Sequence, residues 1–430
     1  MVGVRPWMIW TMSNPVAGTT HSLGHQASFW VAAAVVGHTL WASAAPSMTY
    51  PLYAAEWNLT PTVTTAIFAV YPIVVVTVLV LFGNLSDQIG RRSTILLGLA
   101  ASLVGALLFA IAPSVAWIFA GRAFIGLGVG LATSPATAAM VEFSAAGQSQ
   151  RASSIATAAT AAGLALATLV GGGLIQYAPY PTHLNFWVLF AVLAALFCAA
   201  WFLPQPAPSQ TSTRWRPGAI RVPRHMRKIF IAAAIAMTAA YAHGVTMLAL
   251  GAQIARDLVG SGNALANGAA IALFAIVTGV IAVLAKAIPA KTSIILGGVA
   301  SAVGMALLML SAEQHSLSIF LATAVAAGAG YSLLFSGGLG LINANAPASH
   351  RAGTLSAMYL IAFLTMGVIA VALGAAATAW GLNVAIDLGS PAIALLGIAA
   401  SVLANSIGGP SSIAVIPSPR RLSTVDSRTK

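Results

Sequence analysis

The sequence predicts an all-α membrane protein with twelve transmembrane helices arranged as two six-helix halves. Three observations lead to this fold class. Charged residues make up only 6% of the 430 positions, against about 25% in an ordinary soluble domain. Apolar stretches of about 20 residues, the length that crosses a bilayer, recur along the chain. The basic residues between them fall almost entirely in alternate loops, as the positive-inside rule requires.

The apolar stretches define the expected helices in order. They cover residues 29–50, 62–82, 94–112, 115–142, 152–177 and 185–203, then 229–254, 267–287, 292–311, 317–344, 354–380 and 389–407. The first six form an N-terminal half, 29–203, and the last six a C-terminal half, 229–407. Residues 1–28 and 408–430 are expected to be cytoplasmic tails. Residues 204–228 are rich in proline, serine and basic residues, which is typical of a flexible cytoplasmic linker.

The basic residues also predict how the chain faces the membrane. With the N-terminus in the cytoplasm, all but two of the 19 lysines and arginines lie in the tails, the linker or the other cytoplasmic loops. The exceptions are Arg122, inside the fourth helix, and Arg256, at the outer end of the seventh. We therefore expect a multi-pass protein of the cytoplasmic membrane with both termini in the cytoplasm. Residues 1–27 lack the features of a cleaved signal peptide, and either Met1 or Met12 could be the start.

Composition and missing motifs exclude several classes of protein. A net charge of +12 would suggest nucleic-acid binding in a soluble protein, but here the basic residues are scattered between apolar segments. Cys198 is the single cysteine, so there is no intrachain disulfide and no zinc-type cysteine pair. The chain contains no phosphate-binding Gly-x4-Gly-Lys loop, no His-Glu-x-x-His and no Gly-x-Ser-x-Gly. We expect no ATP, metal or other cofactor, and no enzyme activity.

The two halves resemble each other, which predicts an internal repeat. At an offset of 200 residues the matched pairs are Gly128 with Gly328, Gly130 with Gly330 and Arg151 with Arg351; at 199 they are Arg92 with Lys291 and Ile95 with Ile294. Two six-helix halves related by a parallel repeat suit a transporter whose halves rock around a site near the middle of the membrane.

The loop between the second and third helices carries the most specific motif. It reads Gly83-Asn-Leu-Ser-Asp87-Gln-Ile-Gly90-Arg91-Arg92. With these residues the chain resembles the major facilitator superfamily, whose signature loop has the same glycines, acidic residue and basic pair. One departure is Gln88, where the family usually has a basic residue. The resemblance implies that this loop closes the cytoplasmic side when the transporter faces outward.

The fourth helix extends the resemblance. Arg122, Gly126, Gly128 and Gly130 match the family's pattern of a membrane-embedded arginine followed by spaced glycines. The glycines suit tight packing, and an arginine inside the membrane is costly enough to indicate a function. The alternative for Arg122 is a side chain that reaches out to the membrane surface. Glu142, at the inner end of this helix, lies where the family often has an acidic partner, which predicts a contact with Arg91 or Arg92.

The fifth helix bears on the direction of transport. Gly163, Ala167, Thr168, Gly171 and Gly172 lie in the frame of the family's antiporter motif, which has glycine and proline where this chain has Ala167 and Thr168. The glycines that remain favour efflux slightly over uptake. Small residues that serve only helix packing explain these positions almost equally well.

The substrate site is expected between the halves, near the middle of the membrane. The candidate side chains for the substrate or proton pathway are His38, Trp41, Arg122, Tyr241, His243, Tyr331 and Tyr359. No Asp or Glu lies clearly at mid-depth in a predicted helix, so His38 or His243 is the candidate proton carrier; both can equally be buried, hydrogen-bonded side chains. An apolar, aromatic-edged site with one arginine suggests a small amphipathic or weakly anionic substrate.

These observations predict a secondary transporter that moves a small organic molecule by alternating access. Proton-coupled efflux of an amphipathic drug or metabolite is the first hypothesis. Two alternatives remain: uptake of a small metabolite together with protons, and a membrane receptor or scaffold of the same fold that does not transport. The expected partners are the substrate, protons and the lipid bilayer.

Overall fold

The computed structural model describes residues 23–145, 148–204 and 222–407. Within these ranges it has twelve helices that are long and apolar enough to cross a membrane, which confirms the all-α fold class and the predicted number of spans. Most of the two expected tails and of the expected linker lie outside the described residues. Their predicted place in the cytoplasm therefore stays a prediction.

The first six spans form the N-terminal half. Its elements are α1 (His25–Ala44), the 3₁₀ segment η1 (Ala45–Met48), α2 (Tyr50–Glu56), α3 (Pro61–Phe82), α4 (Leu85–Ile89), α5 (Arg91–Ala110), α6 (Val115–Glu142), α7 (Ser149–Tyr177) and α8 (Pro181–Trp201). Together α1, η1 and α2 make the first span. The short α4 lies in the loop between α3 and α5, where the signature motif is.

The last six spans form the C-terminal half. Its elements are η2 (Arg224–Met226), α9 (Arg227–Val245), the π-helical segment η3 (Thr246–Leu250), α10 (Gly251–Asp257), α11 (Ala264–Leu284), η4 (Ala285–Ala287), α12 (Ala290–Glu313), α13 (Leu317–Asn345), α14 (Ala348–Trp380) and α15 (Leu382–Ser406). Together α9, η3 and α10 make the seventh span.

Two expected helices are interrupted. The stretch expected as a single helix over 29–50 begins earlier, at His25, and changes to 3₁₀ geometry at Ala45. Pro46 has no N–H to continue the α-helical hydrogen bonds, and its ring crowds the preceding turn. The stretch expected at 229–254 begins at Arg227 and contains the π-helical segment. The first span of each half is therefore broken, a feature that the apolar pattern did not indicate.

Several helices also extend beyond the apolar stretch that predicted them. The helix expected from residue 354 begins at Ala348, and the one expected from residue 389 begins at Leu382. Arg351 and Asp387 lie in these extensions. A hydropathy pattern ends at a charged residue, whereas a helix continues for as long as its backbone hydrogen bonds do. Helices α1 and α9 likewise begin at His25 and Arg227, a few residues before the apolar stretches that predicted them.

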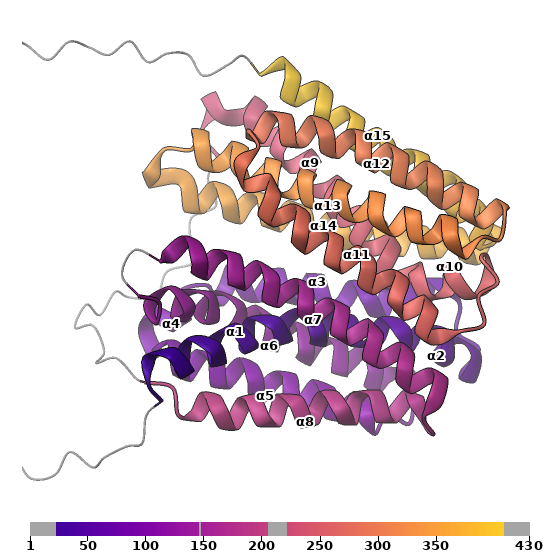
Figure 1. The fold of residues 1–430 in the computed structure, drawn as a ribbon, viewed down its shortest axis with the longest axis horizontal. Coiled ribbons are helices and arrows are strands. Elements are labelled where there is room, and N and C mark those ends of the chain that lie inside the picture. The colour runs from indigo at the N-terminus through magenta and orange to yellow at the C-terminus, as the bar shows by residue number, and fades with distance from the viewer. Residues whose placement is uncertain (1–22, 146–147, 205–221, 408–430) are drawn as a thin grey trace, which may run out of the picture.

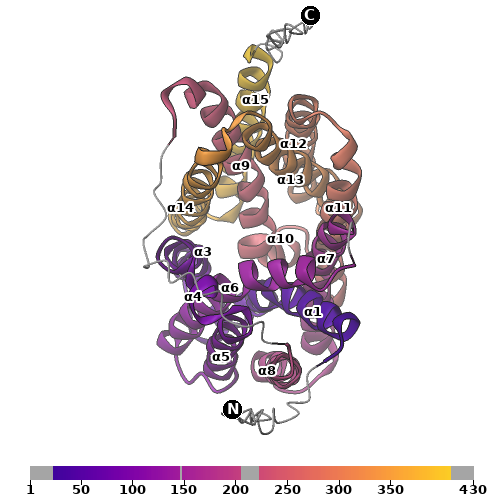
Figure 2. The ribbon, with the colours of Figure 1, turned by 90° about the vertical axis from the view of Figure 1, so that its left-hand side faces the viewer.

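The two halves lie one above the other in Figure 1, with α1–α8 below and α9–α15 above. They meet where α3 contacts α14 and where α7 contacts α11, pairs that stand side by side in Figure 2. We call the side that carries Leu23, Ile407 and α4 the terminal side, because both ends of the described chain lie there. The basic residues predict that it faces the cytoplasm.

Small residues let the helices of the N-terminal half approach closely. An ideal Cβ atom added to Gly163 in α7 would lie 2.0 Å from the carbonyl oxygen of Gly37 in α1. One added to Gly128 in α6 would lie 2.1 Å from the Oγ of Ser102 in α5. A side chain at either glycine would therefore force neighbouring atoms or helices apart. Apolar side chains gain nothing by leaving lipid, so close packing of this kind is a main source of helix association in a membrane.

The other glycines that were predicted to serve packing also have close neighbours in adjacent elements, at distances that differ from one glycine to the next. A Cβ atom added to Gly126 would lie 3.0 Å from Val74, and one added to Gly130 would lie 2.8 Å from Val78. A Cβ atom added to Gly172 would lie 2.6 Å from the carbonyl oxygen of Ala264, and one added to Gly171 would lie 3.3 Å from Met48. Gly126 and Gly130 thus face α3 in the same half. Gly172 differs, because its neighbour lies in α11 of the other half.

The repeat is visible in the packing, but one expected offset is wrong. The corresponding contacts are Gly98–Ala132 with Gly297–Leu334, and Gly128–Ser102 with Gly330–Ser301. Residues of α5 and α12 are therefore related by 199 positions, as from 98 to 297, and residues of α6 and α13 by 202, as from 128 to 330. Gly128 corresponds to Gly330 and not to Gly328. Loops tolerate insertions without moving the helices that they join, so a constant offset does not follow from a shared fold.

We expect Gly163→Ala to destabilise the protein, because the new methyl group meets backbone atoms of α1 that cannot rotate away. Overpacking of this kind costs about 1–3 kcal/mol. Gly173→Ala is the matched control, since its nearest neighbour, Leu265, is 3.9 Å from an ideal Cβ. Both changes gain the same helix propensity. Thermal unfolding of the two purified variants in detergent measures the difference; equal midpoints would contradict the prediction.

Candidate substrate cavity and its gates

A cavity of about 1370 Å³ lies between the two halves. Ser43 and Leu248 line its deep end and are buried. Asn84, Lys286 and Asn343 line its other end and are exposed. These three residues lie at the ends of helices on the terminal side, so the cavity opens there. Its volume accommodates a drug-sized organic molecule.

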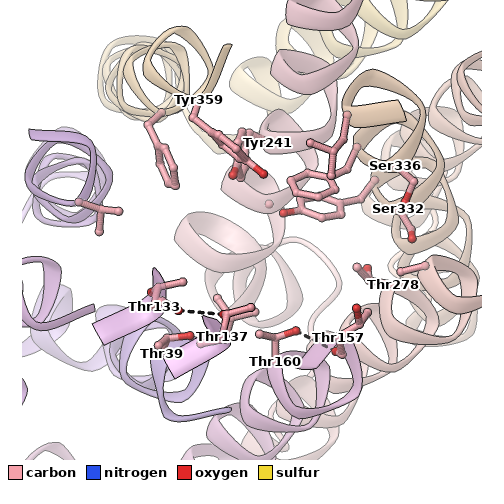
Figure 3. A pocket seen from close by; sticks show the side chains of 18 of the residues that line it. Thr39, Thr133, Thr137, Thr157, Thr160, Tyr241, Thr278, Ser332, Ser336 and Tyr359 are labelled. Carbon is pink, nitrogen blue, oxygen red and sulfur yellow. Dashed lines mark hydrogen bonds between the residues drawn. The ribbon is translucent and has the colours of Figure 1, made fainter. Parts of the chain in front are cut away.

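Hydroxyl groups cover the wall contributed by the N-terminal half (Figure 3). They belong to Thr39 in α1, Thr133 and Thr137 in α6, and Thr157 and Thr160 in α7. Spacings of three and four residues place the threonines of each helix on one of its faces. We call these five residues the hydroxyl wall.

Aromatic rings cover much of the wall contributed by the C-terminal half. They belong to Tyr241 in α9, Tyr331 and Phe335 in α13, and Tyr359 and Phe363 in α14. The rings of Tyr331 and Phe335 are stacked with centroids 6.0 Å apart, and those of Tyr241 and Phe363 are 5.1 Å apart. We call these five residues the aromatic wall. Three of them, Tyr241, Tyr331 and Tyr359, were predicted to lie on the substrate pathway.

The cavity carries little charge. Lys286 is the one charged side chain among the described residues that line it, and its Nζ donates to Ser154 Oγ at 2.8 Å. This bond joins η4 of one half to α7 of the other at the rim. No carboxylate is among the described lining residues. A ligand in the cavity therefore meets hydroxyl oxygens and ring faces, with no fixed negative charge beside it.

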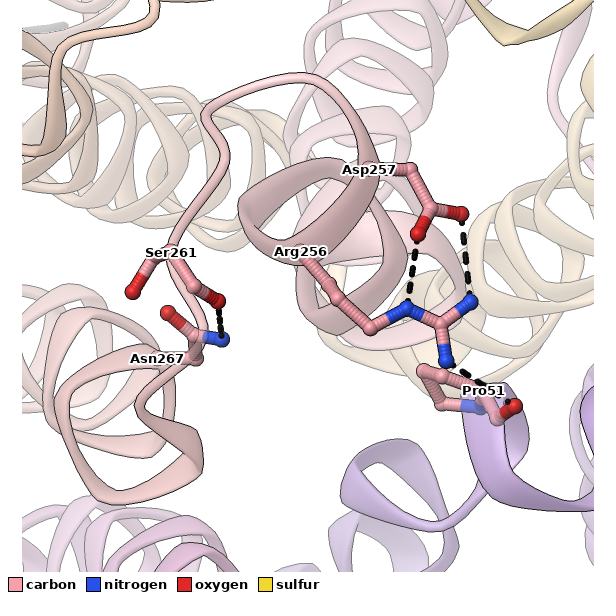
Figure 4. Close-up of polar contacts among 5 residues, drawn as sticks. All are labelled: Pro51, Arg256, Asp257, Ser261 and Asn267. Atoms are coloured by element: carbon pink, nitrogen blue, oxygen red, sulfur yellow. Dashed lines mark hydrogen bonds and ion pairs between the residues drawn. The ribbon is translucent and has the colours of Figure 1, made fainter.

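Arg256 joins the two halves on the side opposite the termini (Figure 4). Its Nε donates to the carboxylate of the adjacent Asp257 at 2.6 Å, and its Nη1 donates to the carbonyl oxygen of Pro51 at 3.2 Å. The first contact lies within α10, and the second crosses to α2. Nearby, Asn267 Nδ2 in α11 donates at 3.1 Å to the carbonyl oxygen of Ser261, which lies in the loop between α10 and α11. The ion pair thus holds a guanidinium group against the other half.

Further hydrogen bonds cross between the halves on this side, from two pairs of helices. The hydroxyl oxygens of Thr62 in α3 and Thr378 in α14 are 2.7 Å apart, and Thr62 also reaches the carbonyl oxygen of Gly374. Gln176 Oε1 in α7 accepts from the backbone N–H of Ala264 in α11 at 2.8 Å. These contacts close the cavity away from the terminal side.

Comparison with known families decides what this arrangement is. The model of the Major Facilitator Superfamily matches residues 29–285, more than half of the chain. The chain belongs to the Major Facilitator Superfamily. It is therefore a secondary transporter of small molecules by family and not an enzyme, and the resemblance seen in the signature loop is confirmed.

Two curated relatives align with parts of this superfamily member. The multidrug efflux pump LfrA of Mycolicibacterium smegmatis is 31% identical over 172 residues, which is 39% of this chain and 34% of the relative. A probable inositol transporter 2 of Arabidopsis thaliana is 45% identical over 51 residues, which is 12% of this chain and 9% of that protein. The chain thus aligns with about a third of the first relative's length and a tenth of the second's.

Solved transporter structures share the fold. The nucleoside transporter NupG superposes with a TM-score of 0.73 at 11% identity, covering 88% of this chain and all of that one. A peptide transporter of the POT type gives 0.71 at 16% identity, with 89% and 94% covered. A bacterial homologue of the lysosomal transporter Spinster, in an inward-facing and unoccupied conformation, gives 0.67 at 13%, with 88% and 96% covered. At these identities the likeness shows the fold alone.

The signature loop of the superfamily lies beside the open end of the cavity. Gly83 ends α3 and lines the rim, and Asp87 is exposed in α4. Gly90 has a φ of +87°, which side chains disfavour, and so makes the turn into α5. Arg91 forms an ion pair with Glu142 at the end of α6, one of the two predicted contacts. Arg92 instead lies over the ring of Trp201, 5.7 Å from its centre.

Asp87 has no ion-pair partner among the described residues in this conformation. The loop is expected to act as a gate when the terminal side closes, and here that side is open. The gating role of the loop residues therefore remains a prediction.

Arg122 is fully buried within the N-terminal half, which excludes a side chain that reaches the membrane surface. Its Nη1 donates to the carbonyl oxygen of Ser43 at 2.6 Å, and the guanidinium lies 4.7 Å from the ring centre of Tyr71 and 5.3 Å from that of Phe68. Arg122 does not line the cavity, although Ser43 and Tyr71 do. It therefore supports the wall from behind. The expectation of a weakly anionic substrate depended on this arginine, and the described cavity does not support it.

The other candidate pathway residues lie beside the cavity lining and not in it. His38 is buried and hydrogen-bonded to the carbonyl oxygen of Val35 in its own helix. His243 is buried, with its Nε2 2.8 Å from Ser301 Oγ in α12. Trp41 packs partly buried against the core. Both histidines thus occupy the alternative position considered for them, a buried side chain with a hydrogen bond.

The hydroxyl wall and Arg256 were missed as functional candidates. The signal for the wall was the recurrence of threonine at three- and four-residue spacing along α6 and α7, which also reads as ordinary helix surface. The signal for Arg256 was its position as a basic residue that the topology does not explain. Neither signal identifies its partner, because Pro51 is about two hundred positions away in the chain.

We expect Glu142→Gln and Asp87→Asn each to slow transport roughly fivefold, because a shift of about 1 kcal/mol between two conformations changes their ratio by that factor. Stability should change by less than about 1 kcal/mol, since the Arg91–Glu142 pair is partly exposed. Glu313→Gln, an exposed acid at the far end of α12, is the control. Flux and melting temperature are measured together; a slow Glu313→Gln variant or normal flux in Glu142→Gln would contradict a specific gate.

We also expect a disulfide between Thr62→Cys and Thr378→Cys to hold the terminal side open and to abolish transport. The two hydroxyl oxygens already lie 2.7 Å apart, and the exposed Cys198 is replaced by serine to avoid other pairings. Reduction should restore flux. The single cysteine variants should transport with or without oxidant. Full flux from completely cross-linked protein would show that this contact does not open during transport.

Proposed function

We propose that the chain exports a small amphipathic organic compound across the cytoplasmic membrane, driven by the proton gradient. The observation that carries this proposal is the cavity, with its hydroxyl and aromatic walls, its near absence of charge and its opening on the terminal side. Such a surface binds apolar and weakly polar groups, because burial of apolar area supplies most of the binding free energy. A partial likeness to a multidrug efflux pump also favours export.

Export requires that the substrate enters from the cytoplasm and leaves on the other side. The predicted cytoplasmic orientation of the terminal side makes the described conformation the one that loads the substrate. Release then requires the contacts of Thr62 with Thr378 and of Arg256 with Pro51 to break. Both contacts are exposed or partly buried hydrogen bonds, each worth about 0.5–1.5 kcal/mol. A closure of this strength can open within a transport cycle.

Proton coupling is proposed through imidazole. His38 and His243 lie within the first spans of the two halves, next to the cavity-lining residues Thr39 and Gly244 in the chain. Histidine is the side chain that ordinarily titrates near neutral pH. No described carboxylate lines the cavity to take this part.

The test is flux of amphipathic organic compounds into inside-out vesicles with an imposed pH gradient. Inside-acid vesicles should accumulate substrate, and a protonophore should stop accumulation. The cross-linked Thr62→Cys and Thr378→Cys variant is the matched inactive control, because it has the same cavity. His243→Gln and His38→Gln should lose the response to the gradient, although facilitated exchange persists.

Each other result has a defined meaning. Accumulation that survives the protonophore would contradict proton coupling. Accumulation that requires the opposite gradient would indicate uptake of substrate together with protons. A complete absence of flux, with the compounds still bound, would favour a receptor of the same fold.

A further inference from the structure

Granted the export proposed above, we infer that the preferred substrate is a flat aromatic compound with N–H or O–H donors along one edge and no localised charge. The inference starts from the direction of the hydrogen bonds in the hydroxyl wall. Each threonine donates to a carbonyl oxygen of its own helix: Thr39 to Val36 at 2.7 Å, Thr133 to Val129 at 2.6 Å, Thr137 to Thr133 at 2.8 Å, Thr157 to Ser153 at 3.0 Å and Thr160 to Thr157 at 2.8 Å.

A hydroxyl group has one hydrogen and two acceptor lone pairs. Because all five hydrogens are already placed, the oxygens are left as acceptors. A ligand carbonyl or carboxylate could receive a hydrogen only if a helix bond were broken. A ligand N–H or O–H meets a free lone pair and breaks nothing. The hydroxyl wall therefore favours donors over acceptors.

The acceptors come from more than one helix. Figure 3 shows Thr133 and Thr137 of α6 and Thr157 and Thr160 of α7 on the same side of the cavity, across from Tyr241 and Tyr359. The two hydrogen bonds drawn there, from Thr137 to Thr133 and from Thr160 to Thr157, run within each helix. Several fixed acceptors on one side of a cavity match a ligand with several donors better than a ligand with a single polar head group.

The aromatic wall selects the body of the ligand. Tyr331 and Phe335 have nearly parallel rings, 6° apart, and Tyr241 packs edge-on against both. Flat rings gain most from such a surface, by offset stacking or edge-to-face contact. The aromatic wall stands across the cavity from the hydroxyl wall. A planar molecule can therefore meet ring faces on one side and acceptors on the other.

The lack of a lining carboxylate restricts the charge. A localised ammonium group would lose hydration in the cavity and find no counter-charge among the described lining residues. A charge spread over a ring system costs less to desolvate and is attracted by aromatic faces. The acceptor oxygens of the hydroxyl wall disfavour anions. The cavity therefore favours aromatic compounds that are neutral or whose charge is delocalised.

The test is binding of two dyes to the purified full-length protein, followed by fluorescence. Proflavine and acridine orange share one ring system and one delocalised charge; the first has two NH₂ groups where the second has N(CH₃)₂. Thr133→Val and Thr157→Val, which remove the oxygen and keep the shape, should each weaken proflavine binding about fivefold to tenfold. Acridine orange should change by less than about twofold. Thr133→Ser and Thr157→Ser should behave as the wild type.

Thr77→Val is the matched control, because Thr77 makes the same bond, to Ile73 at 2.7 Å, but faces away from the cavity lining. It should leave both dyes unchanged. Equal losses for both dyes in the valine variants, or no loss for either, would overturn the inference, as would a wild type that binds neither dye. Because binding is measured without flux, dye selectivity in a protein that fails to export would refute the proposed export and keep the substrate class.

Discussion

Close approach of helix backbones is the constraint on which the rest of the structure depends. Apolar side chains gain no hydrophobic free energy when they move from lipid into the protein, so close packing and a few polar bonds hold the helices of each half together. Where Gly163 meets Gly37 and Gly128 meets Gly98, backbone atoms of neighbouring helices lie too near for any side chain to intervene. Each half is consequently closely packed. The cavity lies between the two halves.

The two seams between the halves differ in length. The contacts of α3 with α14 run from Thr62–Thr378 to Ile73–Gly367, after which residues of both helices line the cavity. The contacts of α7 with α11 run from Gln176–Ala264 through Ala161–Gly279, and the bond of Ser154 with Lys286 extends them to the rim. In this conformation the α7–α11 seam therefore reaches the rim of the cavity.

The sequence predicted what depends on hydropathy and on local motifs. Twelve spans, the turn at Gly90 and the pairing of Glu142 with Arg91 all follow from residues near one another in the chain or from a signature that places them. The sequence did not predict which way the polar side chains of the spans point, because a polar residue that lines a cavity and one that packs behind it give the same sequence pattern. Arg122 and His243 were taken for cavity residues on that ground. Of the predicted aromatic residues, Tyr241, Tyr331 and Tyr359 line the cavity, whereas Trp41 packs beside it, and their role on the substrate pathway stays a prediction.

The position of Arg122 explains why a costly group stands where no substrate reaches it. Burial of a guanidinium without a carboxylate partner costs free energy, and removal of its few remaining partners would increase that cost. Its bond to Ser43 holds α1 just before the change to 3₁₀ geometry at Ala45, and its guanidinium packs on the ring of Tyr71 in α3. The same helix that carries Arg122 presents Thr133 to the cavity and ends at Glu142, the partner of Arg91. One helix thus supports the wall through Arg122, lines the cavity through Thr133 and carries the acidic partner of Arg91.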